Sequence, residues 1–294
     1  MLLLFANTSL LSATNDISPS VVTAYTYHLK PPYIIDEKLK SGLYFDLLSL
    51  ISDDEIEYRL AYMPRKRINK LLERGNLEGV ILGVSPHWFS DSQQSKYLWT
   101  SAFIEDRDEI ISHVDTPFEF RIDTLSDKTM AGVRGLFYVG LNKAVVSGRL
   151  ERFDTESAEQ IIDMVYHQRV DFGVVSRSTL EYLHEKTKYI DSLHISTIPH
   201  ESYLRHVLVP KHLSPVAAHV NRRLGTQLKT EAWQKMMSHY SLSKRKSLSI
   251  GKSLSIGRSL SIGRSLSKGK SLSMAESLSI NESQSLAESL SINE

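Results

Sequence analysis

The alternation of apolar and polar positions predicts strands and helices in turn from about residue 20 to residue 113. Strands are predicted over residues 21–27, which are rich in β-forming residues, over 56–62, which alternate, over 79–84, which form a short buried run, and over 104–113, where the chain leaves this unit. Residues 42–51 place Leu43, Leu47, Leu48 and Ile51 on one helical face. Residues 65–74 follow Pro64 and stop at Gly75, as a helix does. This half of the chain is therefore predicted to be an α/β unit.

A second unit of the same kind is predicted from about residue 118. Strands are expected over residues 130–133, 150–153, 170–175 and 203–210, and helices up to about 147, over 157–167, from 178, and over 215–239. Strands that alternate with helices imply parallel sheets in a three-layer α/β architecture. Two such units in a row predict two lobes.

The composition excludes several classes of function. Of 294 residues, 41% are hydrophobic and 23% charged, as is usual for a globular protein, and no apolar run approaches the roughly 20 residues that span a bilayer. Residues 1–240 carry 27 basic and 30 acidic groups, and this net charge of −3 provides no basic surface for nucleic acid. The chain has no cysteine, so neither a disulfide nor a cysteine-based metal site is predicted.

Both ends of the chain differ from the body. Residues 1–19 begin with a short apolar stretch, which favours a secretory leader, although no basic residue precedes Lys30; the alternative is a ragged cytoplasmic N-terminus. Residues 241–294 are nine hexapeptides in which serine fills 18 of 54 positions. We expect a disordered low-complexity tail with too little apolar surface to offset its ordering entropy; the alternative is a left-handed β-helix.

Six short blocks occur in the body in an order and spacing that known proteins share. They are Lys30-Pro31-Pro32-Tyr33, residues 42–48 (GLYFDLL), residues 63–75 from Met63-Pro64 to Gly75, residues 97–103 (YLWTSAF), residues 132–138, and Arg169-Val170-Asp171. With these blocks the chain resembles the bacterial extracellular solute-binding proteins of family 3, the polar amino-acid-type periplasmic binding proteins.

The resemblance implies a type II periplasmic-binding-protein fold, in which two three-layer α/β lobes are joined by two crossovers and enclose a ligand. Lobe 1 would comprise residues 20–112 and 203–240, and lobe 2 residues 113–202. It further implies a periplasmic monomer that captures a small polar ligand, such as an amino acid, for a membrane transporter permease or a receptor, with no cofactor. The alternatives are a dehydratase-like enzyme on the same scaffold and a sensory domain.

The stretch after the third predicted strand departs from the family pattern. Amino-acid-binding members place an arginine there to hold the ligand carboxylate, whereas residues 83–91 of this chain (GVSPHWFSD) contain none. The chain resembles instead a divergent subgroup with a Pro-x-x-Arg pattern after the second strand. That likeness points to Arg67, whose guanidinium can bind a carboxylate through two parallel hydrogen bonds.

Seven residues are candidates for ligand binding: Tyr33, Arg67, Ser85, Trp88, Arg134, Tyr138 and Asp171. The two arginines would hold an anionic group from opposite lobes, the aromatic residues would form apolar walls, and Asp171 would pair with an ammonium group. The alternatives are solvated cations, aromatic residues packed in the core, and an aspartate that caps a loop.

No catalytic or metal-binding set is predicted. None of the 11 histidines has a second histidine at ligand spacing, and His200 and His206 merely flank a predicted strand. Ser85 lacks the G-x-S-x-G pattern of a nucleophile, and Asp106 and Asp108 lie in a polar stretch that is interpreted as solvated. We therefore expect a binding protein without catalytic activity.

Overall fold

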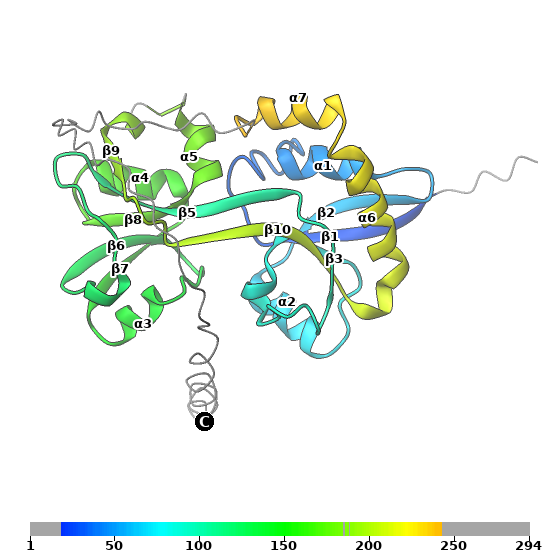
Figure 1. Ribbon diagram of the computed structural model, residues 1–294, viewed down its shortest axis with the longest axis horizontal. Coiled ribbons are helices and arrows are strands. Elements are labelled where there is room, and N and C mark those ends of the chain that lie inside the picture. The colour runs from blue at the N-terminus through cyan, green and yellow to red at the C-terminus, as the bar shows by residue number, and fades with distance from the viewer. Residues whose placement is uncertain (1–18, 185, 188, 243–294) are drawn as a thin grey trace, which may run out of the picture. The chain divides into compact units, whose positions relative to one another are not determined.

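Two β-sheets joined by two long strands organise the part of the chain that the computed structural model describes, which is residues 19–184, 186–187 and 189–242 (Figure 1). The strand order is β2-β1-β3-β10-β5-β8-β6-β7, and β4 and β9 pair at the sides with β10 and β5. We define lobe 1 as the sheet β2-β1-β3-β10 with its helices, and lobe 2 as the sheet β5-β8-β6-β7 with its helices.

Lobe 1 has helices on both faces of its sheet. The strands are β1 (Ser20–Thr26), β2 (Ile56–Tyr62), β3 (Val80–Val84) and β10 (Glu201–Val209), with β1 parallel to both β2 and β3. Helices α1 (Leu43–Ile51), α6 (Ser214–Gln227) and α7 (Glu231–His239) cover one face, and α2 (Arg65–Glu73) covers the other. Alternate strand residues enter the two cores, as the period of two in a strand requires.

Lobe 2 repeats this arrangement. Its strands are β5 (Ile104–His113), β6 (Lys128–Val133), β7 (Leu150–Thr155), β8 (Phe172–Ser176) and the short β9 (Leu193–Ile195). Helices α4 (Ala158–Tyr166) and α5 (Arg177–His184) pack on one face, and α3 (Leu141–Val146) on the other. Neighbouring strand residues such as Val174 and Val175 therefore lie in opposite cores.

Strands β5 and β10 carry the chain between the lobes. They pair antiparallel from Glu201↔Asp108 to Arg205↔Ile104, after which β10 shifts register between His206 and Val207 and pairs with β3 and with β4 (Leu98–Trp99). The first half of β10 thus belongs to one sheet and the second half to the other. The two-lobed α/β fold with two crossovers is confirmed.

The closing helix predicted over residues 215–239 is wrong in one respect, because it is two helices. Helix α6 ends at Gln227 and α7 begins at Glu231, where the Thr230 side chain accepts a hydrogen bond from Trp233 N at 3.2 Å. A threonine N-cap satisfies a backbone donor that a new helix leaves unpaired, so it stabilises a break at this position. The short strands β4 and β9 were also not predicted.

No helix among residues 19–184 and 189–242 has the length and apolar character that crossing a membrane requires. The predicted leader, apart from residue 19, and the predicted tail, apart from residues 241–242, lie outside the described residues.

Candidate functional site

A cavity of about 530 Å³ lies between the lobes. Lobe 1 contributes Tyr27, His28, Lys30, Arg65 and Trp88 to its lining, lobe 2 contributes residues 135–139, and the paired strands β5 and β10 contribute Asp108, Glu201, Tyr203 and Arg205. The volume is within the range of about 300–1,000 Å³ that is usual for small-molecule sites.

The lining follows from the direction of the parallel strands. The chain leaves the carboxyl ends of β1, β3 and β6 at the side that faces the cavity, which is where open α/β sheets bind ligands. After β3, Pro86 opens a short 3-10 helix (Pro86–Phe89) that presents Trp88 to the cavity. The Trp88 indole donates to Glu201 Oε1 at 3.1 Å and packs edge-on against Tyr203 with ring centroids 4.6 Å apart.

Arg65 is held firmly at the start of α2. Its guanidinium lies 3.7 Å from the centroid of the Phe89 ring and donates to the Tyr27 hydroxyl at 2.5 Å, to the Trp88 carbonyl oxygen and to Asn69 Oδ1 at 2.8 Å. None of these partners is anionic. Arg65 therefore brings an uncompensated positive charge to the cavity in a preorganised position.

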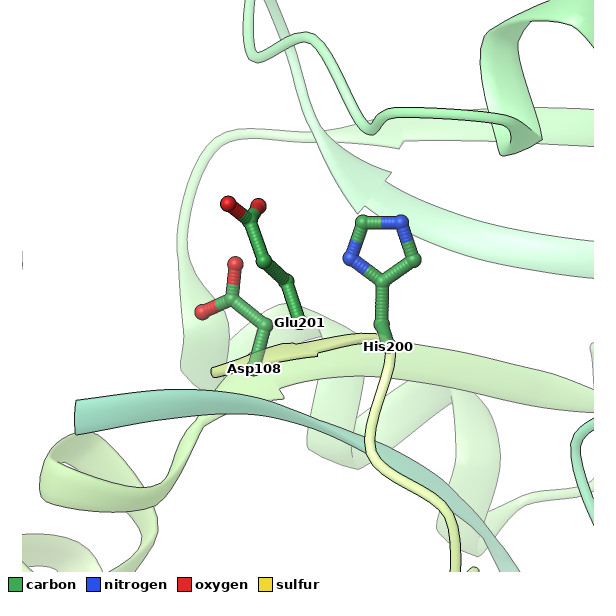
Figure 2. Close-up of side chains that lie close together, drawn as sticks. All are labelled: Asp108, His200 and Glu201. Carbon is green, nitrogen blue, oxygen red and sulfur yellow. The ribbon is translucent and has the colours of Figure 1, made fainter. Parts of the chain in front are cut away.

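Asp108 and Glu201 bring negative charge to the same cavity, opposite in sign to that of Arg65. Asp108 accepts a hydrogen bond from the Tyr203 hydroxyl at 2.9 Å, and Glu201 accepts from Trp88. Burial, together with the neighbouring Asp108 charge, raises the pKa of the Glu201 carboxyl despite the Trp88 hydrogen bond. With His200, these two carboxylates form a group whose potential ligand atoms all lie within 4.8 Å of one another, so these residues could hold a metal ion (Figure 2).

His28 adds a neutral polar group to the cavity. It is buried, and burial together with the Arg205 charge lowers the pKa of its imidazole well below the ordinary value, so the ring is uncharged at neutral pH. Its Nε2 is buried without a hydrogen-bond partner in the described part of the chain. Such an atom can bind a polar group of a ligand.

Behind the cavity, a buried ion pair lies at the junction of the lobes. Arg205 is 0% exposed and donates to Asp106 Oδ2 at 3.1 Å, to the Tyr203 hydroxyl at 3.1 Å and to the Gly83 carbonyl at 2.8 Å. Burial by itself raises the pKa of the Asp106 carboxyl, but the Arg205 charge and hydrogen bonds from Tyr33 and Ser178 outweigh burial and lower it. The prediction that Asp106 is solvated is therefore wrong, because strand pairing places this carboxylate inside the junction.

The same network ties the lobes together. The Tyr33 hydroxyl in lobe 1 donates to Asp106 Oδ2 at 2.7 Å and lies 3.0 Å from Ser178 Oγ, on α5 of lobe 2. Beside it, the Thr179 hydroxyl of α5 donates to the Pro31 carbonyl at 2.7 Å. These contacts form a connected polar network at the junction of the lobes.

Two of the seven candidate residues, Trp88 and Tyr138, line the cavity. Tyr138 is buried, and its hydroxyl accepts a hydrogen bond from Val133 N at 3.0 Å. Tyr33 and Ser85 are also buried, but neither lines the cavity. The Tyr33 hydroxyl is hydrogen-bonded to Asp106, and Ser85 directly precedes the 3-10 helix.

The other three candidates lie elsewhere. Arg67 is exposed on α2, and Arg134 is 67% exposed, with Nη1 3.9 Å from Glu156 Oε1. Asp171 accepts hydrogen bonds from Lys128 Nζ at 2.9 Å and from the Thr129 amide and hydroxyl at 2.8 Å each. The structure therefore places Asp171 where it joins the starts of β6 and β8, which matches the loop-capping alternative.

Sequence reasoning missed Arg65, Asp108, Glu201 and Arg205. A signal existed for Arg65, because it precedes the buried Ile68 by three residues and so shares the core-facing side of α2, whereas Arg67 does not. A signal also existed in residues 104–113, where the period of two puts Asp108 on the same side of the strand as Ile110. No local signal identifies the register that brings Asp108 opposite Glu201.

Solved structures share this architecture at low sequence identity. An ancestral arginine-binding protein bound to arginine matches with a TM-score of 0.58 and 16% identity, over 75% of this chain and 98% of that chain. A protein of glutathione import through the cystine ABC importer of Streptococcus mutans matches with a TM-score of 0.61 and 14% identity, over 76% and 96% of the two chains. An ancestral amino acid-binding protein, a precursor of cyclohexadienyl dehydratase, matches with a TM-score of 0.57 and 13% identity, over 75% and 95%.

No family model matches the sequence, and no curated protein matches it. The structural likenesses nevertheless define the class of fold. The chain has the two-lobed fold of the amino-acid-binding solute-binding proteins, as the resemblance in its sequence implied.

Proposed function

We propose that the protein is a solute-binding protein that captures a small zwitterionic ligand of the amino-acid class between its lobes and releases it to a membrane transporter. The observation that carries the proposal is the charge pattern of the cavity, with the fixed cation Arg65 on lobe 1 and the carboxylates of Asp108 and Glu201 on the crossover strands. A ligand that carries both a carboxylate and an ammonium group matches both charges at once.

In this proposal Arg65 takes the part of the arginine that is missing after β3. A carboxylate in a partly desolvated cleft needs a cationic partner, because an unpaired buried charge is very unfavourable. The stacking of Arg65 on Phe89 and its hydrogen bond to Tyr27 hold the guanidinium in place before the ligand arrives, so little conformational entropy is lost on binding. Trp88 and Tyr138 provide apolar walls on opposite lobes, and the ligand bridges the lobes when they close.

Export to the periplasm, with residues 1–19 as a leader, and action as a monomer are part of the same proposal. The binding-protein class is proposed over a dehydratase-like enzyme, although one structural neighbour is a dehydratase precursor. An enzyme would need a carboxylate or histidine placed on the reacting atom of its substrate. In the cavity, Asp108 and Glu201 instead accept hydrogen bonds from Tyr203 and Trp88, an arrangement that suits recognition of a positive charge.

The test uses two arginines on the same helix. We expect that isothermal titration with the set of common amino acids finds a ligand, and that Arg65→Gln weakens its binding by several hundred-fold, since removing one partner of a buried charge pair costs about 3–5 kcal/mol. The exposed Arg67→Gln is the matched control and should bind like the wild type.

The opposite result, with loss of binding in Arg67→Gln alone, would restore Arg67 as the binding residue. If neither substitution changes the affinity, Arg65 does not recognise the ligand charge. The bound ligand should be recovered unchanged by mass spectrometry after prolonged incubation; repeated turnover would make the protein an enzyme.

A further inference from the structure

Asp108 and Glu201 form a pair of carboxylates directly opposite each other on antiparallel strands. They are register partners on β5 and β10, so their side chains leave the same face of the sheet, where like charges destabilise the pair. Their hydrogen-bond partners are neutral, the Tyr203 hydroxyl and the Trp88 indole. Within the described part of the chain, neither carboxylate forms an ion pair with a lysine or an arginine. The pair therefore presents negative charge that a cation would neutralise.

His200 supplies a nitrogen ligand to the same place. Its backbone N–H donates to the Asp108 carbonyl at 2.8 Å, which fixes the start of β10 beside β5. Its Nε2 lies 2.8 Å from the Val139 carbonyl oxygen, which can only accept, so Nε2 carries the proton. The other ring nitrogen, Nδ1, then has a free lone pair, and this atom is buried without a hydrogen-bond partner in the described residues.

The imidazole is oriented toward the carboxylates. Figure 2 shows one ring nitrogen of His200 on the side of Glu201 and Asp108. The ring packs edge-on against Tyr138, with centroids 5.9 Å apart, which restricts its plane. Histidines that bind metals generally donate their second N–H to a carbonyl or carboxylate in this way, since that bond sets the tautomer and the direction of the lone pair.

We propose that Asp108, His200 and Glu201 bind a divalent transition-metal ion, with His200 Nδ1 and one oxygen of each carboxylate as its ligands. One imidazole and two carboxylates are a donor set that suits Zn²⁺ above all, and Mn²⁺ next. Three protein ligands leave at least one coordination position for water. Because Asp108 and Glu201 line the cavity, that position faces the cleft.

The geometry requires only a local contraction. The three ligand atoms lie within 4.8 Å of one another, whereas ligand atoms around a tetrahedral Zn²⁺ are about 3.4 Å apart, given bonds of about 2.0–2.2 Å. Rotation of the three-bond Glu201 side chain can close this difference.

The decisive measurement is titration of the tag-free full-length protein, stripped with chelator, with Zn²⁺ alone. We expect one tightly bound equivalent, and we expect Asp108→Asn, Glu201→Gln and His200→Ala each to weaken it by at least about 100-fold, since loss of even an indirect supporting contact of a metal ligand costs 10–100-fold. His206→Ala is the matched control, because His206 is a half-buried histidine of β10, as His200 is a half-buried histidine just before β10, and it binds the Thr100 carbonyl.

A thermal-unfolding comparison separates a lost ligand from a damaged fold. Without metal, Glu201→Gln should unfold at or above the wild-type temperature because it relieves the like-charge contact, while Zn²⁺ should raise the unfolding temperature of the wild type and of His206→Ala only. The metal site uses the two carboxylates that the proposed function assigns to the ammonium group, so a bound metal ion and an ammonium group would compete for them. Because no organic ligand is used, the titration tests the metal site independently of the proposed function. Absence of stoichiometric Zn²⁺ binding, or binding that survives in Glu201→Gln and His200→Ala, would overturn the proposal.

Discussion

Replacement of Asp106 by asparagine tests whether the buried ion pair is what allows Arg205 to occupy the junction of the lobes. Asp106 is 2% exposed and Arg205 is 0% exposed, so solvent cannot screen the charge that Asp106→Asn leaves behind. Removing one partner of such a pair destabilises a protein by about 3–5 kcal/mol. At about 2–4 °C per kcal/mol for a domain of 150–250 residues, the unfolding midpoint should fall by about 6–20 °C.

The assay is urea denaturation followed by far-UV circular dichroism, with calorimetry for the midpoint. The pKa of Asp106 is lower in the folded protein than its unfolded value of about 3.9, so the carboxylate contributes stability that is present above that pH and is lost as the pH falls through the folded pKa. The difference in free energy of unfolding between the wild type and Asp106→Asn should therefore be full at pH 7 and shrink in strongly acidic buffer.

Two further variants make the reasoning refutable. Glu57→Gln breaks an exposed ion pair with Arg59 and should leave the midpoint unchanged, since exposed pairs contribute little. Arg205→Met in the Asp106→Asn background removes the unpaired charge and should recover part of the loss. If the free energies of unfolding of Asp106→Asn and the wild type differ by less than about 1 kcal/mol at pH 7, the ion pair does not stabilise this junction. The same conclusion follows if their difference does not change with pH.

Two other substitutions have definite expected outcomes. Gly83→Ala should lower the free energy of unfolding by at least about 2 kcal/mol, because Gly83 has a φ of +75° and an added Cβ would lie 1.7 Å from the hydroxyl of the fully buried Tyr44. A soluble variant with a wild-type melting curve would contradict this prediction. Asp171→Asn should lower the free energy of unfolding by about 1 kcal/mol, because Asp171 is 34% exposed and its contacts to Lys128 and Thr129 are partly screened. Ligand affinity in the titration should stay unchanged. A loss of affinity at equal stability would assign Asp171 to the binding site.

The order and type of most elements could be predicted because they depend on local periodicity. The strand over residues 56–62, whose positions alternate as in a strand, and the strand over residues 104–113 were predicted with the bounds that the structure has. The break between α6 and α7 was missed, although Thr230 followed by Glu231 is a local N-cap signal, because the apolar period continues across it.

The candidate site could be predicted only in part. Trp88 and Tyr138 were among the predicted candidates and line the cavity, because they follow strands whose carboxyl ends face it. Arg65 and Arg67 have the same chemistry and differ by two positions, about 200° around the helix. The apolar face that Ile68 and Leu72 pack on the sheet decides which of them faces the cavity, and the spacing of Arg65 to Ile68 was the signal for it.

By itself, the sequence of this protein determined its alternating elements, its two α/β units and their parallel strands, because each of these features depends on residues within a few positions of one another. Tertiary structure alone decided which charges meet. Asp108 and Glu201 become neighbours through the register of β5 and β10, and Arg205 reaches Asp106 through the same pairing. The register between distant strands is set by the packing of both lobes together. The local sequence around a residue therefore does not predict which residue lies opposite it.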